Sequence, residues 1–179
     1  MNIRPMPVLL SLVISAGLLF GGYFAYQSYA MESPLQKVVS GIQGVELVST
    51  HLSAEAVDVQ VKLTAGKSLR EVYQQVQNEG RQVIGSRELR LKVAGEPSPK
   101  LNEWWSSTLF EVAQAMDTKQ YAQIPVTLQA RTAADPASGI RAVSEMDDRF
   151  VYITITDGQA SKYVMLSRTP VKVGVWPNE

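Results

Sequence analysis

Residues Ala65-Gly66-Lys67-Ser68 are the stretch of this chain that comes nearest to a nucleotide-binding motif, since an expected strand precedes them and an expected helix follows. A phosphate-binding loop needs a further glycine five residues before Gly66. That position is Val61, within the strand, so too few free backbone amides remain to surround a phosphate. Ser68-Leu69-Arg70-Glu71 instead fits a capping box, in which the serine and glutamate side chains satisfy free amides at the start of a helix. We therefore predict a turn and a helix cap here.

The other residue types that could do chemistry are one histidine, His51, and an acidic group of Glu145, Asp147 and Asp148. Nucleophilic triads and most zinc sites need a histidine placed among partners, and we expect His51 to be an exposed loop residue. The acidic group lacks the glycine-punctuated spacing of a calcium loop, so we interpret it as turn residues. The chain has no cysteine, which excludes disulfides and thiolate ligands. We expect no enzyme activity, no cofactor and no metal.

Composition and charge limit the kinds of partner. The chain has 179 residues, of which 45% are hydrophobic, enough to build a packed core in one ordinary domain. Its 17 lysines and arginines balance its 17 acidic residues. Nucleic-acid-binding surfaces normally show a basic excess, so we expect no nucleic-acid partner.

The first thirty residues have the features of a membrane anchor. No charged residue occurs between Pro5 and Met31, and the apolar core runs from Val8 to Tyr26. A helix needs roughly 20 apolar residues to cross a hydrocarbon layer of about 30 Å. Aromatic side chains, which favour the headgroup region, gather at the far end of the segment: Tyr23, Phe24, Tyr26 and Tyr29. Residues 1–30 are therefore predicted to be an uncleaved signal-anchor.

The flanking charges predict on which side of the membrane the rest of the chain lies. Arg4 and the amino terminus carry positive charge before the apolar segment, whereas the first charge after it is Glu32. Positive flanks tend to stay in the cytoplasm, so we expect a single-pass cell-membrane protein with a cytoplasmic N-terminus and an extracytoplasmic C-terminal domain. Ser28-Tyr29-Ala30 also suits a signal peptidase, and cleavage after Ala30 stays open as an alternative. Both readings leave the domain on the same side.

Hydrophobic periodicity predicts the elements that follow the anchor. Residues 31–44 form a juxtamembrane amphipathic segment, with Leu35, Val38, Val39 and Ile42 at helical spacing. We expect an α+β domain over 45–179, which begins with a β-β-α-β unit: strands at 45–49 and 57–63, a helix from Ser68 that Gly85 ends, and a strand at 89–93.

The second half of this domain is predicted as a long helix and a β-meander. The helix begins at Pro99 and runs to about Gln123, where Pro125 halts it. We expect it to bury Leu101, Trp104, Trp105, Thr108, Leu109, Val112 and Met116. Residues 126–134 fit either a second helix or a strand with Val126, Leu128 and Ala130 inward. Three antiparallel strands then follow near 140–145, 149–156 and 160–167.

The last two strands carry the candidate site. If Asp157-Gly158 forms a two-residue turn, Tyr152 lies opposite Tyr163 and Phe150 lies opposite Met165. Both faces of this hairpin are then apolar, although a sheet with one wet face should be polar on that side. One interpretation is a central hairpin that helices or the Trp176 tail cover on the second face. The other is a partner-binding patch of Phe150, Tyr152, Tyr163 and Met165, because aromatic residues and methionine are enriched at interface cores.

These features predict a non-catalytic, membrane-anchored protein-interaction or assembly module of the cell envelope. Its partners are the membrane, through the N-terminal helix, and another envelope protein or a second copy of the chain. Two alternatives stay open. One is an extracytoplasmic ligand-binding or sensor domain with a pocket between helix and sheet. The other is a carboxylate-based wall hydrolase, which needs two carboxylates flanking a cleft.

Overall fold

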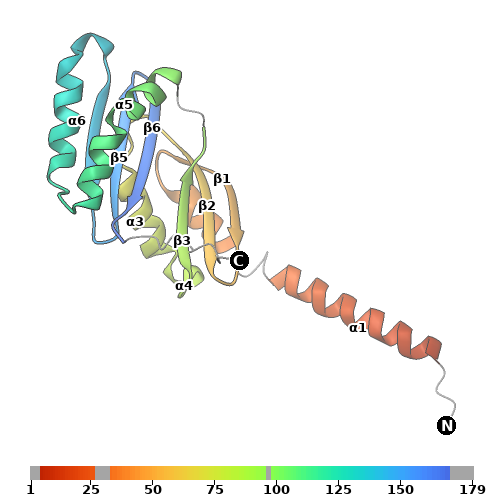
Figure 1. The fold of residues 1–179 in the computed structure, drawn as a ribbon. Coiled ribbons are helices and arrows are strands. Elements are labelled where there is room, and N and C mark those ends of the chain that lie inside the picture. Colours follow the sequence, from red (N-terminus) through yellow and green to blue (C-terminus); the bar gives the residue numbers. More distant parts are fainter. Residues whose placement is uncertain (1–4, 27–32, 96–97, 170–179) are drawn as a thin grey trace. The chain divides into compact units, whose positions relative to one another are not determined.

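The computed structural model describes residues 5–26, 33–95 and 98–169 (Figure 1). Its strands form two three-stranded sheets, ordered β1-β2-β3 and β4-β5-β6, which confirms the predicted mixed α+β class. The elements, in chain order, are α1 (Pro5–Tyr26), α2 (Ser33–Gly41), β1 (Val45–Leu52), β2 (Ala56–Leu63), α3 (Leu69–Glu79), α4 (Arg81–Ile84), β3 (Glu88–Val93), α5 (Pro99–Asp117), α6 (Gln123–Ala134), the 3-10 turn η2 (Pro136–Ser138), β4 (Arg141–Met146), β5 (Phe150–Asp157) and β6 (Ala160–Ser167).

The chain divides into two compact units that each combine separate stretches of sequence. Unit 1 contains Met1–Val61 and Gln75–Lys92, and unit 2 contains Lys62–Gln74 and Val93–Glu179. Helix α3 therefore begins in unit 2 and ends in unit 1. The division of the chain into a membrane anchor (1–30), a juxtamembrane segment (31–44) and an extracytoplasmic domain (45–179) stays a prediction.

The N-terminal apolar segment forms the helix α1. Tyr23 and Tyr26, two of the four predicted interface aromatics, are more than half exposed on it. The side chain of Phe24, all of Tyr29 and the alternative cleavage site after Ala30 lie outside the described residues. Over the part of the chain that the structure describes, no helix combines the length and the apolar character that a membrane span requires.

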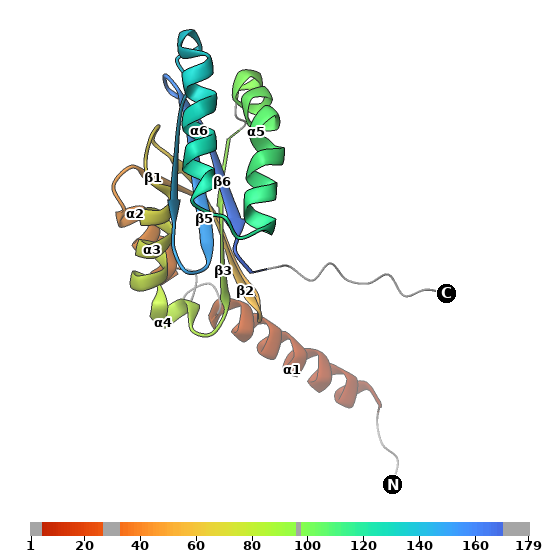
Figure 2. The same cartoon turned by 60° about the vertical axis from the view of Figure 1, so that its left-hand side comes forward.

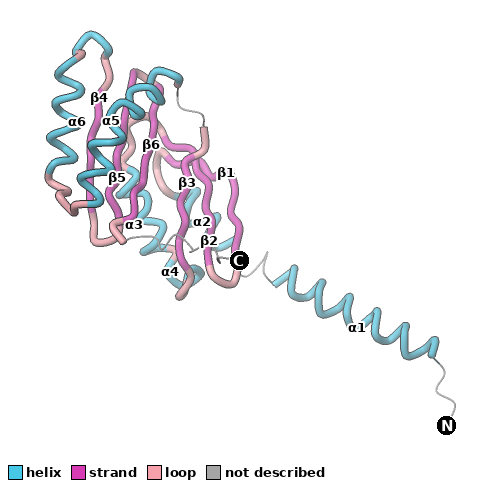
Figure 3. The backbone as a smooth tube through the Cα atoms, viewed as in Figure 1, coloured by secondary structure: helices cyan, strands magenta, loops and turns pink. Residues whose placement is uncertain are grey.

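Unit 1 contains α1, α2, the end of α3, α4 and most of the first sheet, whose elements are labelled in Figure 3. The helical spacing predicted for residues 35–42 is confirmed, because Leu35, Val39 and Ile42 are buried and α2 packs against β1. In β2, every second residue is a buried valine, as the period of two predicts. Strand β1 is longer than predicted and includes His51, which is exposed but not in a loop as we expected.

The helix predicted from Ser68 to Gly85 is divided in two at Gly80. A β-carbon at Gly80 would lie 2.6 Å from the carbonyl oxygen of Val76 and 2.9 Å from Cδ1 of Leu35. This close approach admits only glycine, and a glycine is also a poor residue for continuing a helix. The short helix α4 resumes with Gly80 as its N-cap. The prediction of one continuous helix was therefore wrong.

Unit 2 has α5 and α6 over one face of the sheet β4-β5-β6, where the two helices lie side by side (Figure 2). Their core is a cluster of nine buried residues: Leu101, Val112, Ala115, Ile124, Leu128, Ile140, Val151, Ile153 and Ile155. Trp104, Trp105 and Met116 pack at the margin of this cluster, whereas Leu109 is 40% exposed and was wrongly predicted to be buried.

Helix α5 ends at Asp117, before the predicted stop near Gln123. The amide of Gln120 donates to the carbonyl of Ala115, the amide of Lys119 donates to the carbonyl of Met116, and Lys119 has φ of 57°. These two bonds around a left-handed residue are a Schellman motif, in which glycine is the usual left-handed residue. Because lysine occupies that position in place of glycine, the residue type there does not indicate the helix end. Residues 123–134 are helical, and Pro125 lies in the first turn of α6, where a proline costs no hydrogen bond.

Candidate interaction face

The β5–β6 hairpin turns one residue later than predicted. Asp157 pairs with Ala160, so Gly158 and Gln159 are the two central residues. Gly158 has φ of 59°, which the first central position of a type II′ turn requires and glycine adopts without strain. The predicted turn at Asp157-Gly158 was therefore wrong.

The corrected register changes the cross-strand partners. Tyr152 lies opposite Met165, Phe150 opposite Ser167, and Tyr163 opposite Thr154. The pairing moves by two residues, and side chains alternate with a period of two, so each residue keeps its face of the sheet. Phe150, Tyr152, Tyr163 and Met165 consequently share one face, opposite to the face that α5 and α6 cover.

Tyr73, from the first half of α3, packs on this face. Its ring centroid lies 5.3 Å from that of Phe150 in an edge-to-face arrangement and 6.1 Å from that of Tyr152. Phe150 and Tyr152 are 6.0 Å apart. Tyr152 is 1% exposed, whereas Phe150, Tyr163 and Met165 are half-buried. The helical pattern predicted a buried Tyr73, but nothing in it indicated which strand Tyr73 would contact.

The carboxylate of Asp147 lies at the edge of the cluster of rings that Tyr73, Phe150 and Tyr152 form. Asp147 accepts hydrogen bonds from the hydroxyl of Tyr152 at 2.7 Å and from the amides of Arg149 and Phe150, each at 2.9 Å. Burial acts to raise the pKa of Asp147, but the bonds from Tyr152 and the two amides outweigh it, so its pKa is lowered from 3.8. Burial and the bond to Asp147 raise the pKa of Tyr152. Asp147 is therefore a charged cap of the β4–β5 hairpin.

Tyr163 connects β6 to the loop before α3. Its hydroxyl donates to the carbonyl oxygen of Thr64 at 3.0 Å, and burial raises its pKa. In the same loop, the hydroxyl of Ser68 accepts from the amide of Glu71 at 3.1 Å and donates to a carboxylate oxygen of Glu145 at 2.5 Å. The serine half of the predicted capping box is confirmed, and Glu71 pairs with Lys67 at 3.7 Å.

The acidic residues at 145 and 147 bind groups of the protein itself. Besides Ser68, Glu145 pairs with Arg70 at 3.8 Å, and the oxygens of Asp147 hold the amides and the phenol described above. Within the described residues, no three histidine or acidic side chains gather as they would around a metal ion.

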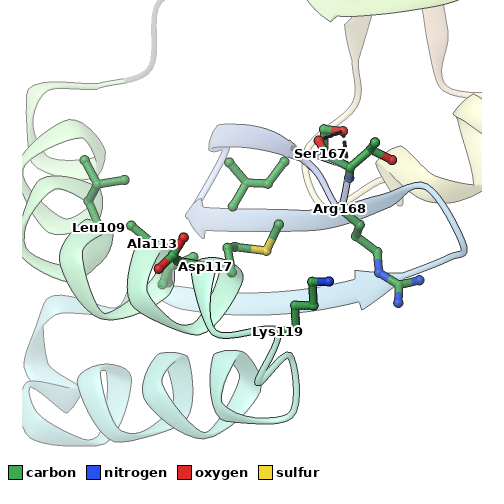
Figure 4. A pocket seen from close by; sticks show the side chains of 10 residues that line it. Leu109, Ala113, Asp117, Lys119, Ser167 and Arg168 are labelled. Carbon is green, nitrogen blue, oxygen red and sulfur yellow. Dashed lines mark hydrogen bonds between the residues drawn. The ribbon is translucent and has the colours of Figure 1, made fainter. Parts of the chain in front are cut away.

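A groove with a volume of about 410 Å³ lies between α5 and β6 (Figure 4). The sensor alternative expected a pocket between helix and sheet, but it did not specify these two elements. Its apolar wall contains Leu109, Val112, Ala113, Met116 and Leu166. Lys119 and Arg168 lie at one end and Leu109 at the other. Leu109 and Ala113 of α5 line the groove but stay exposed to solvent, because the neighbouring strand covers them only in part. The helical period that predicts the buried side of α5 does not distinguish these edge positions from core positions. We call it the α5/β6 groove.

Comparison with known proteins identifies no relative: no protein-family model, no curated protein and no solved structure matches this chain.

Proposed function

We propose that this chain is a non-catalytic, membrane-anchored protein-interaction module of the cell envelope, with the residues after the anchor outside the cytoplasm. The observation that carries the proposal is the surface of α1. Six consecutive or near-consecutive apolar side chains of this helix are between 54% and 75% exposed: Leu12, Val13, Ile14, Leu18, Leu19 and Phe20.

These side chains point in every direction around the helix, since successive residues are about 100° apart. A helix that is apolar on all sides needs an apolar medium around it, which is either a protein core or lipid. Each exposed square ångström of apolar surface costs roughly 25 cal/mol in water. The uncharged stretch from Pro5 to Met31 and the basic residue before it support lipid as that medium and an extracytoplasmic domain.

The interaction role is supported by apolar side chains that unit 2 leaves at its surface. Phe110 is 82% exposed, Val143 60% and Val126 58%, and Phe150, Tyr163 and Met165 are half-buried beside Tyr73. The buried Tyr152 supports the fold of this face and does not offer contact area of its own. Confinement of both partners to one membrane raises their effective concentration, so a modest interface suffices.

The anchor and its orientation are tested together. The full chain is expressed with Asp148→Cys, an exposed turn position in a chain without native cysteine. Intact spheroplasts are then treated with a membrane-impermeant maleimide. We expect labelling of an unprocessed protein that stays in the membrane pellet after alkaline carbonate extraction. Labelling only after lysis, or release of an unprocessed chain by carbonate, would contradict the proposal.

The interaction face is tested with a photo-crosslinking amino acid at position 165. A matched control at Ala130, an exposed position on α6, which lies on the opposite side of the sheet, measures non-specific capture. We expect a discrete product from position 165 that Phe150→Ser abolishes while the domain stays folded. An equal product pattern at both positions would argue against this face.

A further inference from the structure

We propose that the α5/β6 groove is the docking site of the C-terminal segment 170–179 of the same chain. The first reason is position. Thr169, the last described residue before this segment, itself lines the groove, together with Ser167 and Arg168. The amide of Thr169 donates to the hydroxyl of Ser167 at 3.2 Å, and that hydroxyl donates to the carbonyl of Thr169 at 3.0 Å. The segment thus starts at the end of the groove.

The second reason is the match in apolar pattern. The segment reads Pro-Val-Lys-Val-Gly-Val-Trp-Pro-Asn-Glu, with Val171, Val173 and Val175 at every second position and Trp176 after them. In an extended chain this spacing gives one apolar face. The groove offers a complementary apolar wall, in which Leu109 is 40% exposed and Ala113 is exposed. Docking therefore removes apolar surface of the groove and apolar surface of the segment from water.

The third reason is reach. From Asp117 to Leu109 the groove follows α5 for about 12 Å, at 1.5 Å per residue. An extended chain from Thr169 to Trp176 covers roughly 23 Å, at about 3.3 Å per residue. The segment is long enough to pass along the whole groove and to place Trp176 beside Leu109.

The test measures how accessible the groove is in the full chain. A single cysteine is introduced by Ala113→Cys, at an exposed groove position, in a chain that has no other cysteine. The matched control is Ala130→Cys, an exposed alanine on α6 outside the groove. Maleimide labelling rates are compared between the full chain and a chain that ends at Thr169.

We expect truncation to accelerate labelling at position 113 about tenfold, which corresponds to a groove covered roughly nine-tenths of the time, and to leave the rate at position 130 unchanged. In the full chain, Val173→Ser should also accelerate labelling at position 113, whereas Lys172→Ser, on the opposite face of the extended segment, should not. Equal rates at position 113 with and without the segment overturn the proposal. Protection that grows with protein concentration also overturns it, because a second copy would then supply the segment.

Discussion

Asp147 holds together the part of unit 2 in which the candidate face lies. Its carboxylate accepts from two consecutive amides of the β4–β5 turn and from the buried phenol of Tyr152. We predict that Asp147→Asn lowers the free energy of unfolding by about 1–3 kcal/mol at pH 7, because it removes the charge and leaves the phenol with a poorer acceptor. Urea unfolding followed by circular dichroism measures this loss.

The same substitution has a predictable pH dependence. The pKa of Asp147 is lowered from 3.8 in the folded chain, so its stabilising effect is present above that value and is lost as the pH falls through the folded-state pKa. The difference between wild type and Asp147→Asn should therefore shrink between pH 5 and about pH 3. Asp148→Asn, an exposed neighbour in the same turn, should change stability by less than about 0.5 kcal/mol. A difference that stays constant with pH would refute the role assigned to the charge.

Lys119 is strained at the end of α5. Among the described residues it is the one non-glycine with a positive φ, a conformation that costs a residue with a β-carbon roughly 1–2 kcal/mol. We predict that Lys119→Gly raises the free energy of unfolding by about 0.5–1 kcal/mol. Lys119→Ala keeps the β-carbon and should bring no gain, so a stabilisation equal for glycine and alanine would refute the Schellman explanation.

At the scale of elements, periodicity was enough to predict which side of β2 and of α2 is buried. The valines of β2 follow a spacing of two residues, and the buried residues of α2 follow spacings of three and four. These signals are local, since each depends on one element burying one face. The two helix breaks were not predictable in this way. Position 80 has no room for a β-carbon beside the Val76 carbonyl and Leu35, which depends on packing between distant residues, and Lys119 ends α5 against its own conformational preference.

The candidate site was predictable only in part for the same reason. The shared face of Phe150 and Tyr163 depends on strand alternation, which survives an error of two residues in the register. The contact of Tyr73 with Tyr152 and the α5/β6 groove depend on how distant segments pack. Neither has a signature in the spacing of residues along one element.

Helix α6 resolves an ambiguity that the sequence left open, and two substitutions test the result. In a strand, Val126 and Leu128 would both point inward; in the helix, Val126 is 58% exposed and Leu128 is 1% exposed. We predict that Leu128→Ala lowers the free energy of unfolding by about 2–5 kcal/mol, because it leaves a cavity in the core. Val126→Ala should change it by less than about 0.5 kcal/mol. Comparable losses in thermal or urea unfolding would support the strand instead.

At the scale of the whole molecule, the two units share one helix. Residues 69–74 of α3 belong to unit 2, where Tyr73 contacts Phe150, and residues 75–79 belong to unit 1. Unfolding of either unit therefore removes support from the same short helix, and helices of about eleven residues are marginal without tertiary packing. We expect the two units to unfold in one cooperative transition.

Two glycines in unit 1 allow this coupling to be measured. Gly80→Ala forces a β-carbon against the Val76 carbonyl and should lower the free energy of unfolding by about 1–3 kcal/mol. Gly41→Ala, at the end of α2 with nothing within 4 Å, should raise it by up to about 1 kcal/mol. Every tryptophan of the chain falls within the residue range of unit 2.

Tryptophan fluorescence therefore reports on unit 2, although both substitutions are in unit 1. If α3 couples the units, Gly80→Ala shifts the fluorescence midpoint to lower temperature by as much as it shifts the circular dichroism midpoint, and Gly41→Ala shifts both upward together. Two separate transitions, with the fluorescence midpoint unmoved by Gly80→Ala, would show that the second half of α3 can unfold while Tyr73 stays packed. Unit 2 would then be stable without unit 1, and the shared helix would connect the units without coupling them.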